Sequence, residues 1–217
     1  MVAIDGPAAS GKSSTAQWVA ERLGFRHIDS GALYRAAAAA ALSRQADGGF
    51  DETAVLEAVR AISLAASGRS FVPAHQGVPI GDEIRGAAVT QHVSRVARMP
   101  RVREWVNAHV RAAASGASVV VDGRDIGTVV FPDADVKIFL VADPWERARR
   151  RLIQRLQRAP SPEEIAEETE RLVQRDARDA TQTVQARDAI LLDTTYLTQE
   201  EQVERIAALV SVVQRGG

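Results

Sequence analysis

Short apolar runs alternate with longer, amphipathic or alanine-rich segments along the chain. The apolar runs have the length of buried strands and occupy residues 2–5, 25–29, 119–122, 136–141 and 189–193. The segments expected to be helical occupy residues 12–23, 33–42, 53–66, 89–97, 102–114, 146–157, 162–181 and 198–213. Strands that alternate with helices in this way predict an α/β fold, in which helices flank a five-stranded parallel sheet.

Residues 68–86 interrupt the alternation. This stretch holds glycines, prolines and two short β-like pieces, at 70–72 and 78–80. Such a composition is typical of turns and loops rather than of a buried core. We therefore expect a small insertion at this point of the chain.

The composition excludes several classes of protein. The 217 residues suit one domain, and the net charge of −1 is not that of a basic nucleic-acid-binding protein. No apolar run is long enough to cross a membrane, and the first residues lack the pattern of a secretory signal. The absence of cysteine excludes disulfides and thiolate metal sites. We expect a cytoplasmic monomer that binds neither membranes nor nucleic acid.

A phosphate-binding loop is the strongest chemical signal. Residues 6–13 match G-x-x-x-x-G-K-[ST] at every fixed position, between a predicted strand and a predicted helix. Glycines in such a loop let backbone N–H groups surround phosphate oxygens, and the following helix directs its positive end at the same anion. Lys12 can reach the β- and γ-phosphates, and the Ser13 hydroxyl can ligate Mg²⁺. Lys12 is also one of only two lysines among 27 basic residues.

The predicted ATP-binding residues are therefore those of this loop and the start of its helix. They are Gly6, Pro7, Ala8, Ala9, Ser10, Gly11, Lys12, Ser13 and Ser14, with Ser13 as the metal ligand. GTPases that recognise guanine through N-K-x-D are excluded, because neither lysine follows an asparagine. Protein kinases are excluded because the glycine loop is of another type and the H-R-D motif is absent. A small phosphoryl-transfer kinase remains.

Two further segments are suited to an acceptor site. Residues 29–35 (DSGALYR) place an arginine one turn into a helix, and residues 122–134 (DGRDIGTVVFPDA) place an Arg-Asp pair just after a strand. Together with residues 81–85, 94–103 and 175–179, these segments resemble the bacterial cytidylate kinases over nearly the whole chain. The resemblance implies that ATP and Mg²⁺ are used to phosphorylate CMP or dCMP.

The resemblance also implies a three-part organisation of one nucleoside-monophosphate kinase domain. The core would comprise about 1–45, 115–145 and 183–217, the CMP-binding insertion about 46–114, and an arginine-rich lid about 146–182. Carried over position by position, Ser30, Arg35 and Arg124 would hold the CMP phosphate. Ser94, Arg103 and Asp125 would face cytosine, and Arg175 and Asp179 would hold the ribose.

Chemistry supports the role given to Asp125. Cytosine presents an amino donor where uracil presents a carbonyl acceptor, so a carboxylate would accept from the former and repel the latter. Six arginines lie between residues 147 and 158, and they form either a solvated basic face or a lid that delivers cations to the γ-phosphate. We assign catalysis to Lys12, Arg124 and Arg151.

One position departs from the family pattern. The family has a further phosphate-binding arginine after the lid helix, where this chain has Gln182. Either Arg178 takes its place or the CMP phosphate is held by one fewer cation. Two alternatives stay open: a small kinase for UMP, AMP or shikimate, and a nucleotide-binding regulatory module without turnover.

Overall fold

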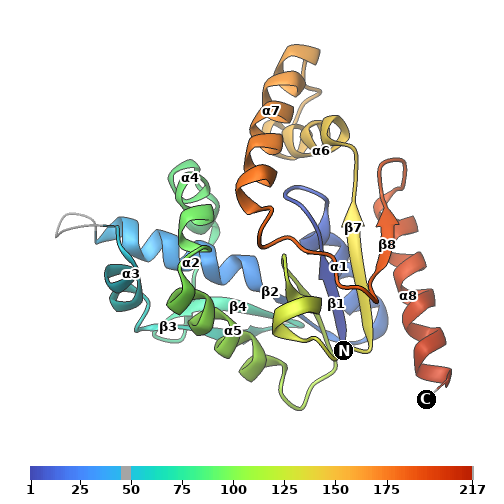
Figure 1. The fold of residues 1–217 in the computed structure, drawn as a ribbon, viewed down its shortest axis with the longest axis horizontal. Coiled ribbons are helices and arrows are strands. Elements are labelled where there is room, and N and C mark those ends of the chain that lie inside the picture. Colours follow the sequence, from blue (N-terminus) through green and yellow to red (C-terminus); the bar gives the residue numbers. More distant parts are fainter. Residues whose placement is uncertain (45–49, 217) are drawn as a thin grey trace. The chain divides into compact units, whose positions relative to one another are not determined.

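The computed structural model describes residues 1–44 and 50–216, and the chain divides into two compact units. The first unit combines residues 1–24 with residues from 120 onward, and the second comprises 25–119. Figure 1 shows the first unit in blue and in yellow to red, and the second mainly in light blue to green. The core boundary that we expected at residues 45–46 lies outside the described residues.

The first unit is built on a parallel sheet. Its strands are β1 (Val2–Asp5), β6 (Val119–Asp122), β7 (Val136–Val141) and β8 (Ile190–Asp193). Strand β1 pairs with β6 on one side and β7 on the other, and β7 pairs with β8. Because all four strands run the same way, the residues after β1, β6 and β7 meet at one edge of the sheet. This edge carries the predicted phosphate loop.

The first unit also contains helices (Figure 1). They are α1 (Lys12–Leu23), α6 (Pro144–Leu156), α7 (Pro162–Asp179) and α8 (Gln199–Gly216), with a π-helical turn at Ile126–Val130. Helix α1 has the predicted bounds and ends at Gly24 in the left-handed conformation, as expected of a C-cap glycine. Helix α7 begins with a capping box between Ser161 and Glu164.

Helices α6 and α7 pack together over the phosphate loop. Their contact is an apolar cluster of Ala8, Ala148, Leu152, Ile165 and Leu172. Ala8 belongs to the loop, whereas the other four side chains come from the two helices. The cluster therefore fixes one end of the predicted lid to the segment that it is expected to cover.

The second unit contains a mixed sheet with helices. Its strands are β2 (Arg26–Asp29), β3 (Ile62–Ser67), β4 (Ser70–His75) and β5 (Val78–Pro79). Its helices are α2 (Ser30–Ser43), α3 (Glu52–Ala58), α4 (Ala87–Val96) and α5 (Pro100–Ala114), with a 3₁₀ turn at Asp82–Arg85. Pro100 occupies the first turn of α5, where its missing N–H costs nothing.

The α/β class is confirmed, but the five parallel strands predicted are not all that the described residues form: β3, β4 and β5 are additional, and β4 pairs antiparallel with the other two. Two local predictions were also wrong. The helix expected at 53–66 ends at Ala58, and residues 62–67 instead form β3. Alanines favour a helix there, yet β3 forms a complete antiparallel hairpin with β4 around Gly68, whose φ is +56°. Strand β4 also pairs in parallel with β2, so residues 70–75 belong to a sheet rather than to a loop insertion.

Within residues 1–44 and 50–216, no helix combines the length and the apolar character needed to span a bilayer.

We predict that Leu152→Ala lowers the free energy of unfolding by about 2–5 kcal/mol, because a 2 % exposed side chain leaves a cavity in the α6–α7 cluster. Urea denaturation measures this change. Ile153→Ala is the matched control, since the neighbouring side chain is 39 % exposed and its loss should cost under about 1 kcal/mol. Equal losses in the two variants would contradict the packing described here.

Candidate functional site

The phosphate loop makes a tight turn directly after β1. Gly6 has a φ of +148°, and a Cβ atom built there would lie 2.1 Å from the Leu140 carbonyl oxygen. No other residue type fits this approach of the loop to β7. Gly11 has a φ of +86° and immediately precedes α1, so the helix begins at Lys12 with its N-terminus directed into the loop. The predicted loop residues 6–14 are thus together in one turn.

Lys12 is buried at the centre of this turn. Its Nζ donates to the Pro7 carbonyl at 2.6 Å and to the Ser10 hydroxyl at 3.4 Å. Burial lowers the pKa of Lys12 well below its usual value, and the positive charges of Arg124 and Arg175 lower it further. The carboxylates of Asp122 and Asp5 act in the opposite direction. A buried lysine beside two arginines is the arrangement expected where a multiply charged anion binds.

Ser13 is paired with a carboxylate that we had not selected from the sequence. Its hydroxyl donates to Asp122 Oδ2 at 2.6 Å, and Asp122 is the buried last residue of β6. The signal available in the sequence was an acidic residue at the end of a buried strand. A hydroxyl and a carboxylate oxygen form the donor set that Mg²⁺ prefers when phosphate and water supply its other ligands.

Three of the predicted acceptor residues lie together in the first unit. Asp179 Oδ2 lies 3.6 Å from Arg124 Nη2 and 3.6 Å from Arg175 Nε. Arg124 Nη1 also donates to the Gly6 carbonyl at 3.1 Å, so this arginine lies against the phosphate loop. Asp125 is buried next to it in the chain. The structure therefore brings Arg124, Arg175 and Asp179 to the loop that holds Lys12.

Asp5 is the last residue of β1 and directly precedes the phosphate loop. Its Oδ1 accepts from the Ile126 N–H and its Oδ2 from the Gly127 N–H, both at 2.8 Å. Burial raises the pKa of Asp5 to about 6, although these two hydrogen bonds oppose the shift. These contacts give Asp5 a structural hydrogen-bonding role.

Arg147 connects the lid helices to the phosphate loop. Its Nη1 donates to the Ala8 carbonyl at 2.8 Å and to Asp176 Oδ2 at 2.7 Å. The other Asp176 oxygen accepts from the Ala8 N–H at 3.1 Å. A backbone amide of the phosphate loop is thus bonded to a carboxylate of α7. Sequence reasoning missed Asp176, because the residue is separated from Ala8 by most of the chain.

The remaining lid arginines have acidic partners within the lid. Arg151 Nε lies 2.9 Å from Glu168 Oε1, and Arg155 Nη1 lies 3.5 Å from the other oxygen of this buried carboxylate. Arg158 pairs with Glu164. The catalytic role of Arg151 stays a prediction. For that role, the Arg151 guanidinium must leave Glu168 or bind Glu168 and a phosphate at the same time.

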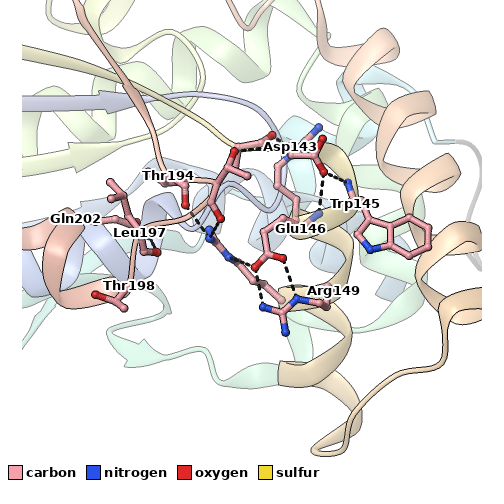
Figure 2. Close-up of polar contacts among 12 residues, drawn as sticks. Asp143, Trp145, Glu146, Arg149, Thr194, Leu197, Thr198 and Gln202 are labelled. Atoms are coloured by element: carbon pink, nitrogen blue, oxygen red, sulfur yellow. Dashed lines mark hydrogen bonds and ion pairs between the residues drawn. The ribbon is translucent and has the colours of Figure 1, made fainter.

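The base of the lid is tied to the loop that follows β8 (Figure 2). The Asp143 carboxylate caps α6 by accepting from the Trp145 and Glu146 N–H groups, and its own N–H donates to the Thr195 hydroxyl. Glu146 binds Arg149 and Arg150. Arg150 in turn donates to the carbonyls of residues 194 and 195, at 2.7 and 2.8 Å. These two arginines therefore bind acceptors at the base of the lid.

Helix α8 supports the phosphate loop from another side. Gln202 is buried, and its Oε1 accepts from the Thr15 hydroxyl at 2.8 Å while its Nε2 donates to the Leu197 carbonyl. Gln199 Nε2 donates to the same Thr15 oxygen at 2.8 Å. The first turns of α1 are thereby held in place by neutral side chains.

The second unit carries the other predicted acceptor residues. Ser30 is buried at the start of α2, which Asp29 caps by accepting from the Ala32 N–H at 3.0 Å. Arg35 Nη1 donates to the Thr90 hydroxyl at 3.1 Å. Ser94 lies one turn beyond Thr90 on α4 and is also buried. Arg35 and Ser94 are thus associated with the same stretch of α4.

Arg103 and the residues around Gln182 complete the predicted set. Arg103 Nη1 donates to the Ala97 carbonyl at 3.1 Å, which bridges the junction between α4 and α5. The Gln182 N–H donates to the Asp179 carbonyl at the end of α7, and Arg178 Nε donates to the Gln174 carbonyl of its own helix. In this arrangement Arg178 lies on the exposed side of α7.

Comparisons with known proteins agree on one family. The sequence model described as "Cytidylate kinase" matches residues 2–212. The cytidylate kinase of Geobacillus kaustophilus is 46 % identical over 216 residues, covering 97 % of this chain and 96 % of the relative. That of Limosilactobacillus fermentum is 42 % identical, covering 96 % and 94 %.

One solved structure supports the fold. It is an uncharacterized protein from Eubacterium ventriosum with a TM-score of 0.52 and 12 % identity, and 97 % of each chain is covered. At this identity the likeness concerns the fold alone.

The raised pKa of Asp5 generates a prediction about stability. Between the ordinary pKa of 3.8 and the folded value of about 6, folded protein holds a proton that the unfolded chain has released. Stability therefore falls as pH rises through this window. We predict that the unfolding free energy of wild type minus that of Asp5→Asn decreases by about 2.4 kcal/mol between pH 4 and pH 7.

Urea denaturation of both proteins at several pH values measures this difference. Asp51→Asn is the control, since this exposed carboxylate also accepts a backbone N–H, from Ala54, but shows no comparable burial. A difference between wild type and Asp5→Asn that stays constant with pH would mean that Asp5 titrates in the folded protein as it does in the unfolded chain.

Proposed function

This chain belongs to the cytidylate kinase family, and from that premise we propose that it transfers the γ-phosphoryl group of ATP to CMP or dCMP, giving ADP and CDP or dCDP. The observation that supports this most directly is the buried Lys12 inside a phosphate loop, with Arg124 and Arg175 near enough to lower its pKa. Three cationic side chains close to one another suit a reaction between two phosphate groups, because the negative charges of these groups repel each other.

The phosphate loop binds the donor. Its backbone N–H groups surround the β-phosphate of ATP, and the Lys12 ammonium leaves the Pro7 carbonyl to bind the β- and γ-phosphate oxygens. Ser13 and Asp122 would hold Mg²⁺, which supplies additional positive charge to the phosphates when bound. The Asp122 carboxylate orients the Ser13 hydroxyl, so the two oxygens are already together before the nucleotide arrives.

The acceptor is recognised by the residues carried over from the family. Arg124, with Ser30 and Arg35, holds the CMP phosphate through guanidinium forks and a hydroxyl. Asp125, Ser94 and Arg103 recognise cytosine. Arg175 and Asp179 hold the ribose, and their ion pair at 3.6 Å is consistent with a shared role.

Catalysis follows from positioning and charge. The transferring group spreads negative charge over its oxygens in the transition state, and Lys12 and Arg124 stabilise that charge without a proton transfer. Arg151 is proposed to join them from the lid after exchanging Glu168 for a phosphate oxygen. Closure of the lid would also exclude water, which suppresses hydrolysis of ATP.

We also propose a cytoplasmic monomer, as the composition indicates. Two alternatives remain testable: a small kinase that prefers UMP, AMP or shikimate, and a regulatory nucleotide-binding module without turnover. Gln182, in place of an arginine, is the feature that favours the module.

We predict that ADP forms from ATP and Mg²⁺ with CMP and dCMP, and only slowly with UMP, AMP or shikimate at matched concentration. Lys12→Ala should lower kcat by about 100-fold or more, because charge stabilisation of the transferring group is removed. A coupled ADP assay measures both. Arg22→Ala, an exposed residue of the same helix, is the control. Turnover led by another acceptor, or near-normal kcat in Lys12→Ala, would refute the proposal.

We predict that Asp125→Asn abolishes most of the preference for CMP over UMP. An amide can donate as well as accept, so it no longer repels the uracil carbonyl, and a loss of about 10-fold or more in the ratio of kcat/KM values is expected. Asp133→Asn is the control, because this aspartate is exposed in the same segment. An unchanged ratio in Asp125→Asn would show that another residue recognises the base.

A further inference from the structure

Asp5 makes contacts that a carboxylate, and no other side chain of its size, can make. Its two oxygens each accept one backbone N–H, from Ile126 and from Gly127, at 2.8 Å. The side chain is 4 % exposed, so water does not replace either bond. An asparagine has a single acceptor oxygen, and its NH₂ group would face the N–H of the other residue.

The segment that Asp5 holds begins immediately after Arg124 and Asp125. Arg124 is assigned to the CMP phosphate and Asp125 to cytosine. Val129 N–H and Val130 N–H donate to the Asp125 carbonyl at 2.8 and 3.3 Å, which closes the π-helical turn behind it. The backbone position of Asp125 is thus defined by this turn and by the Asp5 contacts that follow it.

The end of β1 holds the other part of the segment. The Gly123 N–H donates to the Ile4 carbonyl at 3.0 Å, and Arg124 Nη1 donates to the Gly6 carbonyl at 3.1 Å. Residues 4, 5 and 6 therefore each bond to the segment 123–127. Among residues 4, 5 and 6, two use backbone carbonyls and Asp5 uses its side chain, so the Asp5 contact is the one that requires a particular side chain in β1.

Lys137 also lies close to this segment. A Cβ atom at Gly127 would lie 3.2 Å from Lys137 Cδ and 3.4 Å from Asp5 Oδ2. The Lys137 ammonium donates to the Pro132 carbonyl and to both Asp188 oxygens, at 3.0 and 2.7 Å to the latter. A side chain at position 127 would therefore crowd both the Lys137 stem and the Asp5 carboxylate.

We propose that Asp5 is a positioning residue for acceptor specificity: by holding the Ile126 and Gly127 N–H groups it sets the place from which Asp125 recognises the base and Arg124 the phosphate. The inference deepens the proposed CMP kinase activity and rests on it. Asp5 itself touches neither substrate. Its charge also lies near those of Lys12 and Asp125, so the carboxylate connects the donor loop to the acceptor segment.

The test compares wild type with Asp5→Asn and Gly127→Ala at pH 7.5. In Asp5→Asn we expect kcat/KM for CMP to fall about 10- to 100-fold, since a displacement of about 1 Å at a positioned group has such effects. The activity with UMP should fall less, so that the ratio of the two kcat/KM values drops about 10-fold. General loss of structure would lower both activities together and leave the ratio unchanged.

A second readout follows the backbone directly. Hydrogen–deuterium exchange of the peptide covering residues 123–131 should be faster in Asp5→Asn than in wild type, while α8 exchanges as before. Gly127→Ala disturbs the same contact by crowding Asp5 and Lys137 while keeping the carboxylate, so it should shift the ratio and the exchange in the same direction, by less. Asp51→Asn is the matched control and should change neither.

The outcomes separate this inference from the proposed function. A wild type that does not phosphorylate CMP refutes the proposed function and the inference with it. A wild type that prefers CMP, together with an Asp5→Asn variant of the same CMP/UMP ratio, refutes the inference alone, whether or not exchange is faster. If Asp5→Asn does not fold, an unchanged ratio in Gly127→Ala refutes it.

Discussion

Burial of the Lys12 ammonium group is the constraint on which the first unit depends. Taking a lysine out of water costs several kcal/mol unless its charge is compensated. Here the Pro7 carbonyl, the Ser10 hydroxyl and the charges of Asp5 and Asp122 compensate it in part, while Arg124 and Arg175 oppose them. A phosphate anion would add a negative charge beside Lys12, so nucleotide binding would stabilise the ammonium form that burial disfavours.

The lid shows a related balance. Six arginines follow one another within twelve residues, and without partners they would repel each other strongly. The acids that pair with them, chiefly Glu146, Glu164, Glu168 and Asp176, come from the same two helices. An arginine held by a carboxylate can be transferred to a phosphate at little net cost, because one anion replaces another. This is a physical reason for a lid to carry both signs of charge.

The sequence predicted well those elements whose formation depends on residues close together in the chain. The phosphate loop, the bounds of α1 and the five predicted strands follow from glycine positions, apolar periods and caps that act within a few residues. The helix expected at 53–66 failed because β3 is stabilised by pairing with β4, a contact between different segments. Helix propensity of alanine is worth less than a complete hairpin ladder.

The sequence by itself determined the fold class, through the alternation of apolar runs and helical segments, and the position of the phosphate loop, through one short motif. The acceptor residues were candidates that the family resemblance implied. Only the tertiary structure decided which polar groups are paired. Ser13 binds Asp122, the Ala8 N–H binds Asp176, Arg151 binds Glu168, and Asp5 binds the backbone of Ile126 and Gly127. Three of these four contacts join residues more than 100 positions apart in the chain. No local pattern specifies them, because they exist only when the parallel strands bring their carboxyl ends to one edge and the lid packs over it.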